Sequence, residues 1–127
     1  DVKINIKVGD GLVDIVENNL ILEENTRKHL SELVQPLVNL NVDHMVLGCT
    51  HYPFLIPVLK KILPRKVKII DPAPAVVKQA YRVLESNQIL NTQKIQPGYI
   101  FYTSGDEKLL DRFLKNLTKK KYSIYKV

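Results

Sequence analysis

The first eight residues alternate between polar and apolar side chains, and this period of two predicts a β-strand over residues 1–8. A Gly-Asp-Gly turn at 9–11 ends the pattern, and residues 12–17 then have the spacing of a short helical turn. The longest helix is expected over 22–40, where leucine and valine recur every three or four residues. Pro36 lies inside that pattern and predicts a kink or a split into two helices.

The rest of the chain alternates short apolar runs with amphipathic segments. Strands are expected at 44–48, 67–70, 99–103 and 122–127. Helices are expected from Pro53 to about Leu63, over 75–84 and over 107–117. Residues 87–98 are polar and patternless, which is typical of a linker. This alternation predicts an α/β fold, a three-layer arrangement in which helices cover a mostly parallel sheet.

Composition indicates a soluble globular protein. Hydrophobic residues make up 45% of the 127 positions and charged residues 25%. No apolar run approaches the roughly 20 residues of a membrane helix, and the charged first residues do not form a signal peptide. The single cysteine, Cys49, excludes an intrachain disulfide and fits a reducing compartment. We therefore expect an intracellular protein with no membrane partner.

The net charge of +6 raises the question of an anionic partner. Lysines gather near the C-terminal end, at Lys115, Lys119, Lys120, Lys121 and Lys126. The aromatic and arginine pattern of a nucleic-acid site does not accompany them. The charge pattern thus favours a solvated helix face, and no nucleic-acid partner is expected.

Candidate chemistry gathers in the loops that follow the predicted strands. In parallel sheets, ligands bind beyond the carboxyl ends of the strands. Loops 48–51, 71–73 and 103–106 occupy that position. The second contains Asp71 and the third Ser104, but the sequence gives neither residue a role.

The first of these loops, Gly-Cys-Thr-His at 48–51, carries the strongest signal. Gly48 lets the backbone turn sharply and approach a ligand closely. Cys49 would face the N-terminus of the helix that begins near Pro53, which favours a thiolate. Backbone N–H groups and the Thr50 hydroxyl suit a carboxylate ligand, and His51 is close enough to exchange a proton. These features predict a reactive thiol beside an anion site.

The residues alone leave other interpretations of Cys49 open. A lone cysteine after an apolar strand is commonly a structural core residue. A Cys–His hydrolase would use the same pair of side chains. A zinc site could draw on His44, Cys49 and His51, but paired metal-ligand spacing is missing, so no metal is expected.

The segment VLGCTHYPFL at 46–55 closely resembles the second cysteine motif of the glutamate racemases. The related aspartate racemases usually carry Glu where His51 stands. Further segments resemble the family in order and spacing: DGLVDIVEN at 10–18 with its Val16-Glu17 pair, IIDPAPAV at 69–76, and FYTSGD at 101–106. The chain is identified as the C-terminal part of a member of the aspartate/glutamate racemase family.

The sequence departs from the family pattern in two respects. The family usually has Cys-Pro where Gly9-Asp10 stands and Pro in place of Asp14. The family's Asp-Ser-Gly motif and its first catalytic cysteine, in an Asn-Thr-Ala context, do not occur in this chain. We therefore expect a partial fold. Residues 1–86 would form most of the second racemase domain with the cysteine motif, 87–98 a linker, and 99–127 a strand and helix returning to the first domain.

The resemblance implies interconversion of L- and D-glutamate without pyridoxal phosphate, metal or any other cofactor. Two cysteines flank the α-carbon in this reaction, one as thiolate and one as thiol. Cys49 would be the base toward L-glutamate and the acid when D-glutamate reacts. His51 and Glu17 would support proton transfer around the thiol, while Thr50 and Gly48 would bind the substrate.

The family's product, D-glutamate, feeds peptidoglycan synthesis and so supports cell-wall biogenesis and cell shape. The resemblance thus implies an isomerase of the bacterial cytoplasm whose partner is glutamate, and a homodimer is expected because family members often dimerise. The alternative is a truncated or degenerate racemase-like domain that binds an amino acid or a partner without turnover. With one cysteine, the chain alone is expected to be inactive.

Overall fold

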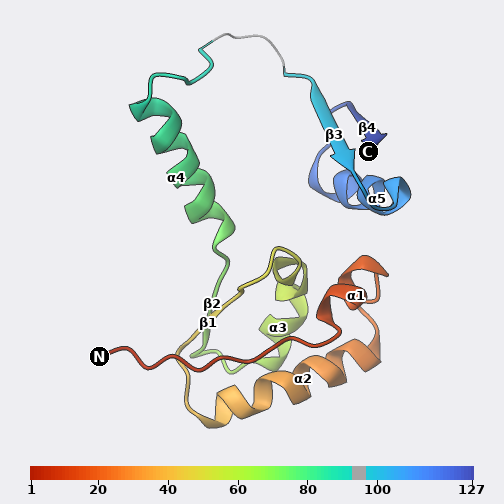
Figure 1. Ribbon diagram of the computed structural model, residues 1–127. Helices are drawn as coiled ribbons and strands as arrows, with labels where there is room; N and C mark the ends of the chain where they lie inside the picture. The colour runs from red at the N-terminus through yellow and green to blue at the C-terminus, as the bar shows by residue number, and fades with distance from the viewer. Residues whose placement is uncertain (93–96) are drawn as a thin grey trace. The chain divides into compact units, whose positions relative to one another are not determined.

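A computed structural model of the chain describes residues 1–92 and 97–127. The chain divides into two compact units, Asp1–Leu90 and Asn91–Val127 (Figure 1). The linker predicted over 87–98 falls partly on 93–96, which lie outside the described residues.

Two helices open the first unit. Helix α1 spans Leu12–Glu17, as predicted, and α2 spans Glu24–Asn39. The predicted split at Pro36 is wrong, because α2 continues through the proline as one helix. A proline removes only its own N–H bond, and Pro36 lies in the last turn, where its carbonyl still accepts the N–H of Leu40.

A parallel β-α-β segment follows. Strand β1 (His44–Val46) pairs in parallel with β2 (Lys68–Ile70), with His44 opposite Lys68. The predicted helix from Pro53 is composite. A 3-10 helix, η1 (Tyr52–Leu55), comes first, and the α-helix α3 covers Ile56–Ile62.

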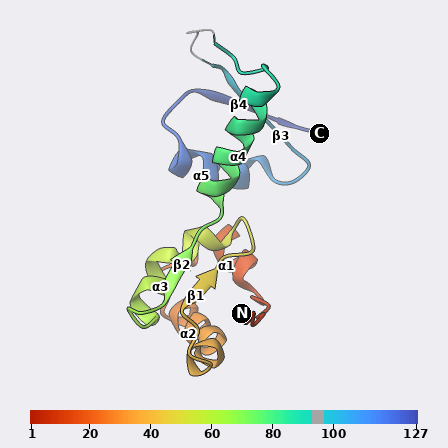
Figure 2. The ribbon, with the colours of Figure 1, turned by 90° about the vertical axis from the view of Figure 1, so that its left-hand side faces the viewer.

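The core of the first unit lies among α1, α2, η1, α3 and one face of β1 (Figure 2). Its buried apolar side chains are Leu12, Val16, Leu30, Val34, Met45, Leu47, Leu55, Val58, Leu59, Leu63 and Val67. The prediction of a buried strand holds for one face only. Met45 and Leu47 are buried, whereas Val46 between them is 62% exposed. One face of this short sheet is therefore open.

The predicted strand over residues 1–8 is wrong: this segment has no regular structure. Its apolar side chains, from Val2 to Val8, are at least 67% exposed. A strand is stabilised by hydrogen bonds to a neighbouring strand. Within the described residues the only strand pairs are β1 with β2 and β3 with β4. Alternation alone therefore does not make this segment a strand.

Helix α4 (Ala73–Ser86) is longer at both ends than the predicted 75–84. It is amphipathic, yet none of its side chains is buried. Val76, Val77 and Tyr81 are each more than half exposed.

The second unit is another parallel β-α-β segment. Strand β3 (Tyr99–Thr103), α5 (Glu107–Leu117) and β4 (Tyr122–Lys126) closely match the predicted bounds. Strands β3 and β4 pair in parallel, with Tyr99 opposite Tyr122. The predicted α/β class is thus confirmed. In the described residues, however, the four strands form two separate sheets of two strands each.

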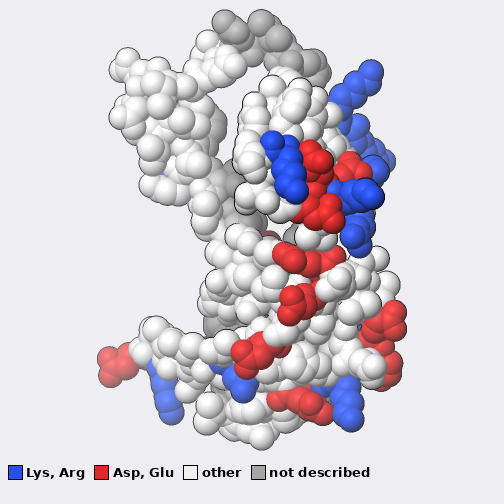
Figure 3. Space-filling view, turned by 45° about the vertical axis from the view of Figure 1, so that its right-hand side comes forward, with Lys and Arg blue, Asp and Glu red and all other residues white. Residues whose placement is uncertain are grey.

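Charged side chains of both signs are interspersed on the face shown in Figure 3. Lysines of the second unit lie there beside acidic side chains, and Lys115 forms an ion pair with Asp111. Among the described residues, no helix combines the length and hydrophobicity needed to cross a bilayer.

Candidate active site

Cys49 lies in the loop where the chain leaves β1. The last ladder hydrogen bond joins the Leu47 N–H to the Ile70 carbonyl, at 3.0 Å. The chain then turns, and the Tyr52 N–H donates to the Cys49 carbonyl at 3.1 Å. The thiol is half-buried, while Gly48 and Thr50 beside it are exposed. The loop thus presents a thiol to solvent at the carboxyl end of the sheet, the usual ligand position in such folds.

The thiol is the first of three side chains that contact one another in a line. Cys49 Sγ lies 3.8 Å from His51 Nδ1, and His51 Nε2 lies 3.2 Å from Glu17 Oε1. The imidazole is 29% exposed and the carboxylate 36% exposed. Glu17 ends α1, whereas His51 immediately precedes η1, so the packing of α1 against η1 joins residues 34 positions apart.

This line can move a proton between sulfur and nitrogen without rearranging the heavy atoms. In the neutral form, the thiol donates to Nδ1 and the Nε2–H donates to Glu17. In the charged form, both ring nitrogens donate, one to a thiolate and one to the carboxylate. The arrangement is therefore suited to acid–base chemistry at sulfur.

The neighbouring loop positions leave room for a ligand. Among the described residues, apart from its two chain neighbours, none has a heavy atom within 4 Å of the position that a Cβ on Gly48 would take. The backbone φ of Gly48 is not positive, so the turn itself does not require glycine, contrary to our expectation. What Gly48 and the exposed Thr50 provide instead is open space beside the thiol.

The helix that follows the Cys49 loop has a smaller dipole than the prediction assumed. The first turn after the loop is the four-residue 3-10 helix η1, and the seven-residue α3 begins only at Ile56. Helix dipole effects decline within the first turn, and short helices have small dipoles. The side chain that contacts the thiol is His51, which in turn contacts Glu17.

The other candidate residues lie elsewhere. His44 pairs with Asp43 at 3.1 Å, and this hydrogen bond lowers the pKa of the Asp43 carboxyl. Asp71 accepts the N–H of Ala73 at 2.9 Å, at the start of α4. In the described parts of the chain, no three His, Cys, Asp or Glu side chains are gathered for a metal ion. The loop at 103–106 belongs to the second unit.

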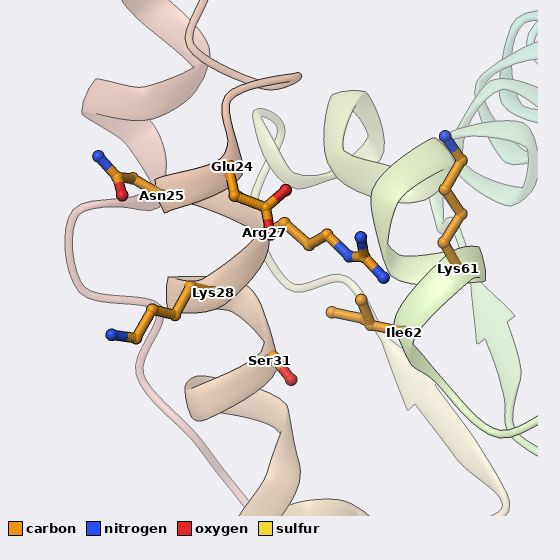
Figure 4. A pocket seen from close by; sticks show the side chains of 7 residues that line it. All are labelled: Glu24, Asn25, Arg27, Lys28, Ser31, Lys61 and Ile62. Atoms are coloured by element: carbon orange, nitrogen blue, oxygen red, sulfur yellow. The ribbon is translucent and has the colours of Figure 1, made fainter.

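A separate pocket of about 490 Å³ lies between α2 and α3 (Figure 4). It is lined by Glu24, Asn25, Arg27, Lys28, Ser31, Lys61 and Ile62. None of the site residues predicted from the sequence contributes to it.

The chain is similar in sequence to known glutamate racemases. No protein-family model matches the chain. The glutamate racemase of Ectopseudomonas mendocina is 38% identical over 84% of this chain and 40% of its own length. That of Carboxydothermus hydrogenoformans is 39% identical over 77% of this chain and 36% of its own. The chain thus spans about 40% of the length of the curated relatives it matches.

The solved structures that resemble this chain are also glutamate racemases. The crystal structure of glutamate racemase isoform RacE1 from Bacillus anthracis matches 99% of this chain with a TM-score of 0.87 and 26% identity. The glutamate racemase of Francisella tularensis, solved in complex with D-glutamate, matches 94% with a TM-score of 0.79 and 28% identity. The chain covers 47% and 44% of these two proteins.

Proposed function

Since the chain is homologous to the C-terminal part of the glutamate racemases, we propose that the complete protein interconverts L- and D-glutamate. The observation that carries the proposal is the line formed by Cys49, His51 and Glu17 at the end of β1. A thiol with an imidazole and a carboxylate behind it can give and take a proton at sulfur. The structure of the Francisella enzyme with D-glutamate supports this substrate.

The proposed reaction needs a proton acceptor on one face of the α-carbon and a donor on the other. The Cys49 thiolate takes the α-proton of L-glutamate and becomes a thiol. A second acid then gives a proton to the opposite face and keeps the negative charge. Cys49 is the only cysteine among the 127 residues, so a second thiol has to come from outside this sequence. The reaction uses neither a metal nor an organic cofactor.

The loop residues next to the thiol fit substrate binding. The exposed Thr50 and the open space at Gly48 would receive a carboxylate of glutamate. The carbanion that forms has to be met by fixed hydrogen-bond donors. We assign no role in the reaction to Asp71, which accepts the N–H of Ala73, or to Ser104.

The biological setting and the domain arrangement are part of the same proposal. D-glutamate is a building block of peptidoglycan, so the enzyme would work in a bacterial cytoplasm, and a homodimer is its proposed assembly. Residues 1–86 would make up most of the second racemase domain, and 99–127 would return to the first.

The decisive test is turnover by the complete protein. It should convert L-glutamate to D-glutamate, followed by chiral chromatography, with incorporation of deuterium from heavy water at the α-carbon. Cys49→Ser should reduce turnover by several powers of ten, as for other cooperating catalytic groups. L-aspartate should react far more slowly, and a preference for aspartate would overturn the assignment.

The 127-residue chain by itself is the matched negative control. It should not produce D-glutamate, because it holds one thiol where inversion needs two acid–base groups. A rate comparable to that of the complete protein, abolished by Cys49→Ser, would contradict the two-thiol mechanism.

A further inference from the structure

Two neighbouring residues, His51 and Tyr52, contact opposite ends of the short helix α1. His51 contacts Glu17 in the last turn, whereas Tyr52 contacts the turn that precedes the helix. The Tyr52 hydroxyl donates to the Gly9 carbonyl at 3.4 Å, and the Leu12 N–H donates to the same carbonyl at 3.2 Å. A helix of this length is only about 9 Å long, so contacts at both ends constrain its position.

The contact between Tyr52 and Gly9 depends on glycine. A Cβ at position 9 would lie 2.6 Å from Tyr52 Oη and 2.9 Å from Tyr52 Cζ. It would also lie 2.7 Å from a methyl carbon of Leu12. A real Cβ essentially never makes contacts this short, so any side chain here would displace the tyrosine ring or the Leu12 side chain at the start of α1. The tip of the tyrosine ring therefore fills the space that the missing side chain leaves.

The same turn is held from another side. His29, on α2, contacts the Asp10 carbonyl through Nε2 at 2.8 Å. Gly11 follows with a positive φ of 72°, a conformation that costs other residues about 1 kcal/mol or more. Contacts from α2 and from η1 thus fix the turn from which α1 starts.

We propose that Tyr52 is a positioning residue for the Cys49–His51–Glu17 line: by filling the space beside Gly9, it holds α1 where Glu17 meets His51. This inference rests on the proposed acid–base role of that line. Tyr52 does not contact the reacting atoms and acts only through the position of Glu17. Its hydrogen bond is long, so the shape of the ring contributes more than the hydroxyl.

Three substitutions separate shape from hydrogen bonding. Tyr52→Phe keeps the ring and should preserve the contact between Glu17 and His51. Tyr52→Ala removes the ring and should release the start of α1. Gly9→Ala keeps the tyrosine but pushes against it, and should have the same effect as Tyr52→Ala.

The measurement is the alkylation rate of Cys49 by iodoacetamide at neutral pH in the full 127-residue chain. With Tyr52 in place, Glu17→Gln should slow alkylation about fivefold, because an interaction of about 1 kcal/mol is lost. In the Tyr52→Ala or Gly9→Ala background, Glu17→Gln should have almost no further effect. In the Tyr52→Phe background, it should again slow alkylation about fivefold.

Tyr81→Ala is the matched control. Tyr81 lies on α4, and its hydroxyl donates to Glu85 at the same distance of 3.4 Å. It should leave the effect of Glu17→Gln unchanged. Circular dichroism identifies any variant that fails to fold, and if Tyr52→Ala does so, Gly9→Ala supplies the comparison.

The outcomes distinguish the positioning role of Tyr52 from the acid–base role of the line on which it rests. If Glu17→Gln has no effect even with Tyr52 present, the acid–base line itself is wrong, and the positioning role falls with it. If Glu17→Gln slows alkylation equally in all backgrounds, the line stands, but Tyr52 is only a packing residue. Loss of the effect in Tyr52→Ala and Gly9→Ala alone supports the proposal.

Discussion

The two parallel β-α-β segments use the polar residues after their first strands in different ways. After β3, the Asp106 carboxylate accepts the N–H of Lys108 at 2.7 Å, and the Thr103 hydroxyl accepts the N–H of Gly105 at 3.0 Å. These are local bonds that begin α5. After β1, His51 instead reaches Glu17, which is 34 residues away. The same place in the topology serves as a helix cap in one segment and as a candidate active site in the other.

The two segments also differ in the size of the buried core that supports the loop after the first strand. The segment after β1 rests on a core to which α1, α2, η1 and α3 all contribute. In the second unit, Leu114 is the one apolar side chain among the described residues that is buried. Side chains that meet over long sequence distances need a packed base to hold them, whereas caps form from neighbouring residues. Loss of core packing should therefore affect the first loop more than the second.

The largest effect is expected from Leu55→Ala. Leu55 ends η1, the helix that His51 immediately precedes, and is fully buried. Its truncation should lower the free energy of unfolding by about 2–5 kcal/mol, as for other buried leucines. Urea unfolding of the first unit, followed by NMR, measures the loss. The control is Leu117→Ala, at a position that is 66% exposed, which should change stability by less than about 0.5 kcal/mol.

A smaller effect is expected from Gly11→Ala. Its backbone φ of 72° suits glycine, so alanine should cost about 1–2 kcal/mol and loosen the start of α1. Gly105, in the turn before α5 of the second unit, has no positive φ, and a Cβ there would make an ordinary contact of 3.6 Å with Thr103 Oγ1. Gly105→Ala should therefore be close to neutral. Equal costs for the two substitutions, measured by thermal unfolding, would refute this difference.

Local sequence patterns predicted the elements that local forces determine. The bounds of α1, α5 and β3 follow from spacing, turn residues and capping, and the structure reproduces them. The strand over 1–8 fails because a strand depends on a partner that alternation cannot supply. Pro36 did not split α2, since the helix keeps its other bonds and its buried face around Leu30 and Val34.

The residues of the candidate site also differ in whether local sequence patterns could predict their contacts. Cys49 and His51 are two residues apart, so their neighbourhood could be inferred from the motif alone. Glu17 came only from the family resemblance, because no local pattern shows that α1 packs against η1. The contact between Tyr52 and Gly9 was missed for the same reason. Its one signal in the sequence was the pair of glycines before α1, which marks a turn but not what fills the space beside it.

Asp106→Ala tests whether the loop after β3 is only a cap. Loss of the bond to the Lys108 N–H should cost about 1 kcal/mol of helix stability in the second unit. The alkylation rate of Cys49 should stay unchanged, because the cap serves α5 alone. Asp106→Asn retains a capping oxygen and should recover most of the stability. A change in thiol reactivity with Asp106→Ala would show that this loop contributes to the site after all.

The smallest expected effect is the pH dependence of the stability of the second unit. It arises from the hydrogen bond between Asp111 on α5 and Tyr122 on β4. Hydrogen bonds from Lys115 and Tyr122 lower the pKa of the Asp111 carboxyl, and the bond to Asp111 raises the pKa of the Tyr122 hydroxyl. A lowered carboxyl pKa stabilises the fold above the unfolded value, and this contribution is lost as pH falls through the folded pKa, below about pH 4. A raised tyrosine pKa stabilises below the unfolded value of about 10, and this contribution is lost as pH rises through the folded pKa.

Asp111→Asn should therefore flatten the pH dependence of unfolding of the second unit at both ends. The changes should be small, since these groups are open to solvent and screened. The measurement is the urea midpoint from pH 3 to pH 11 in wild type and variant, with Asp14→Asn, at an exposed position of the first unit, as control. Unchanged curves for Asp111→Asn would show that the bonds to the Asp111 carboxylate contribute nothing to the stability of the second unit.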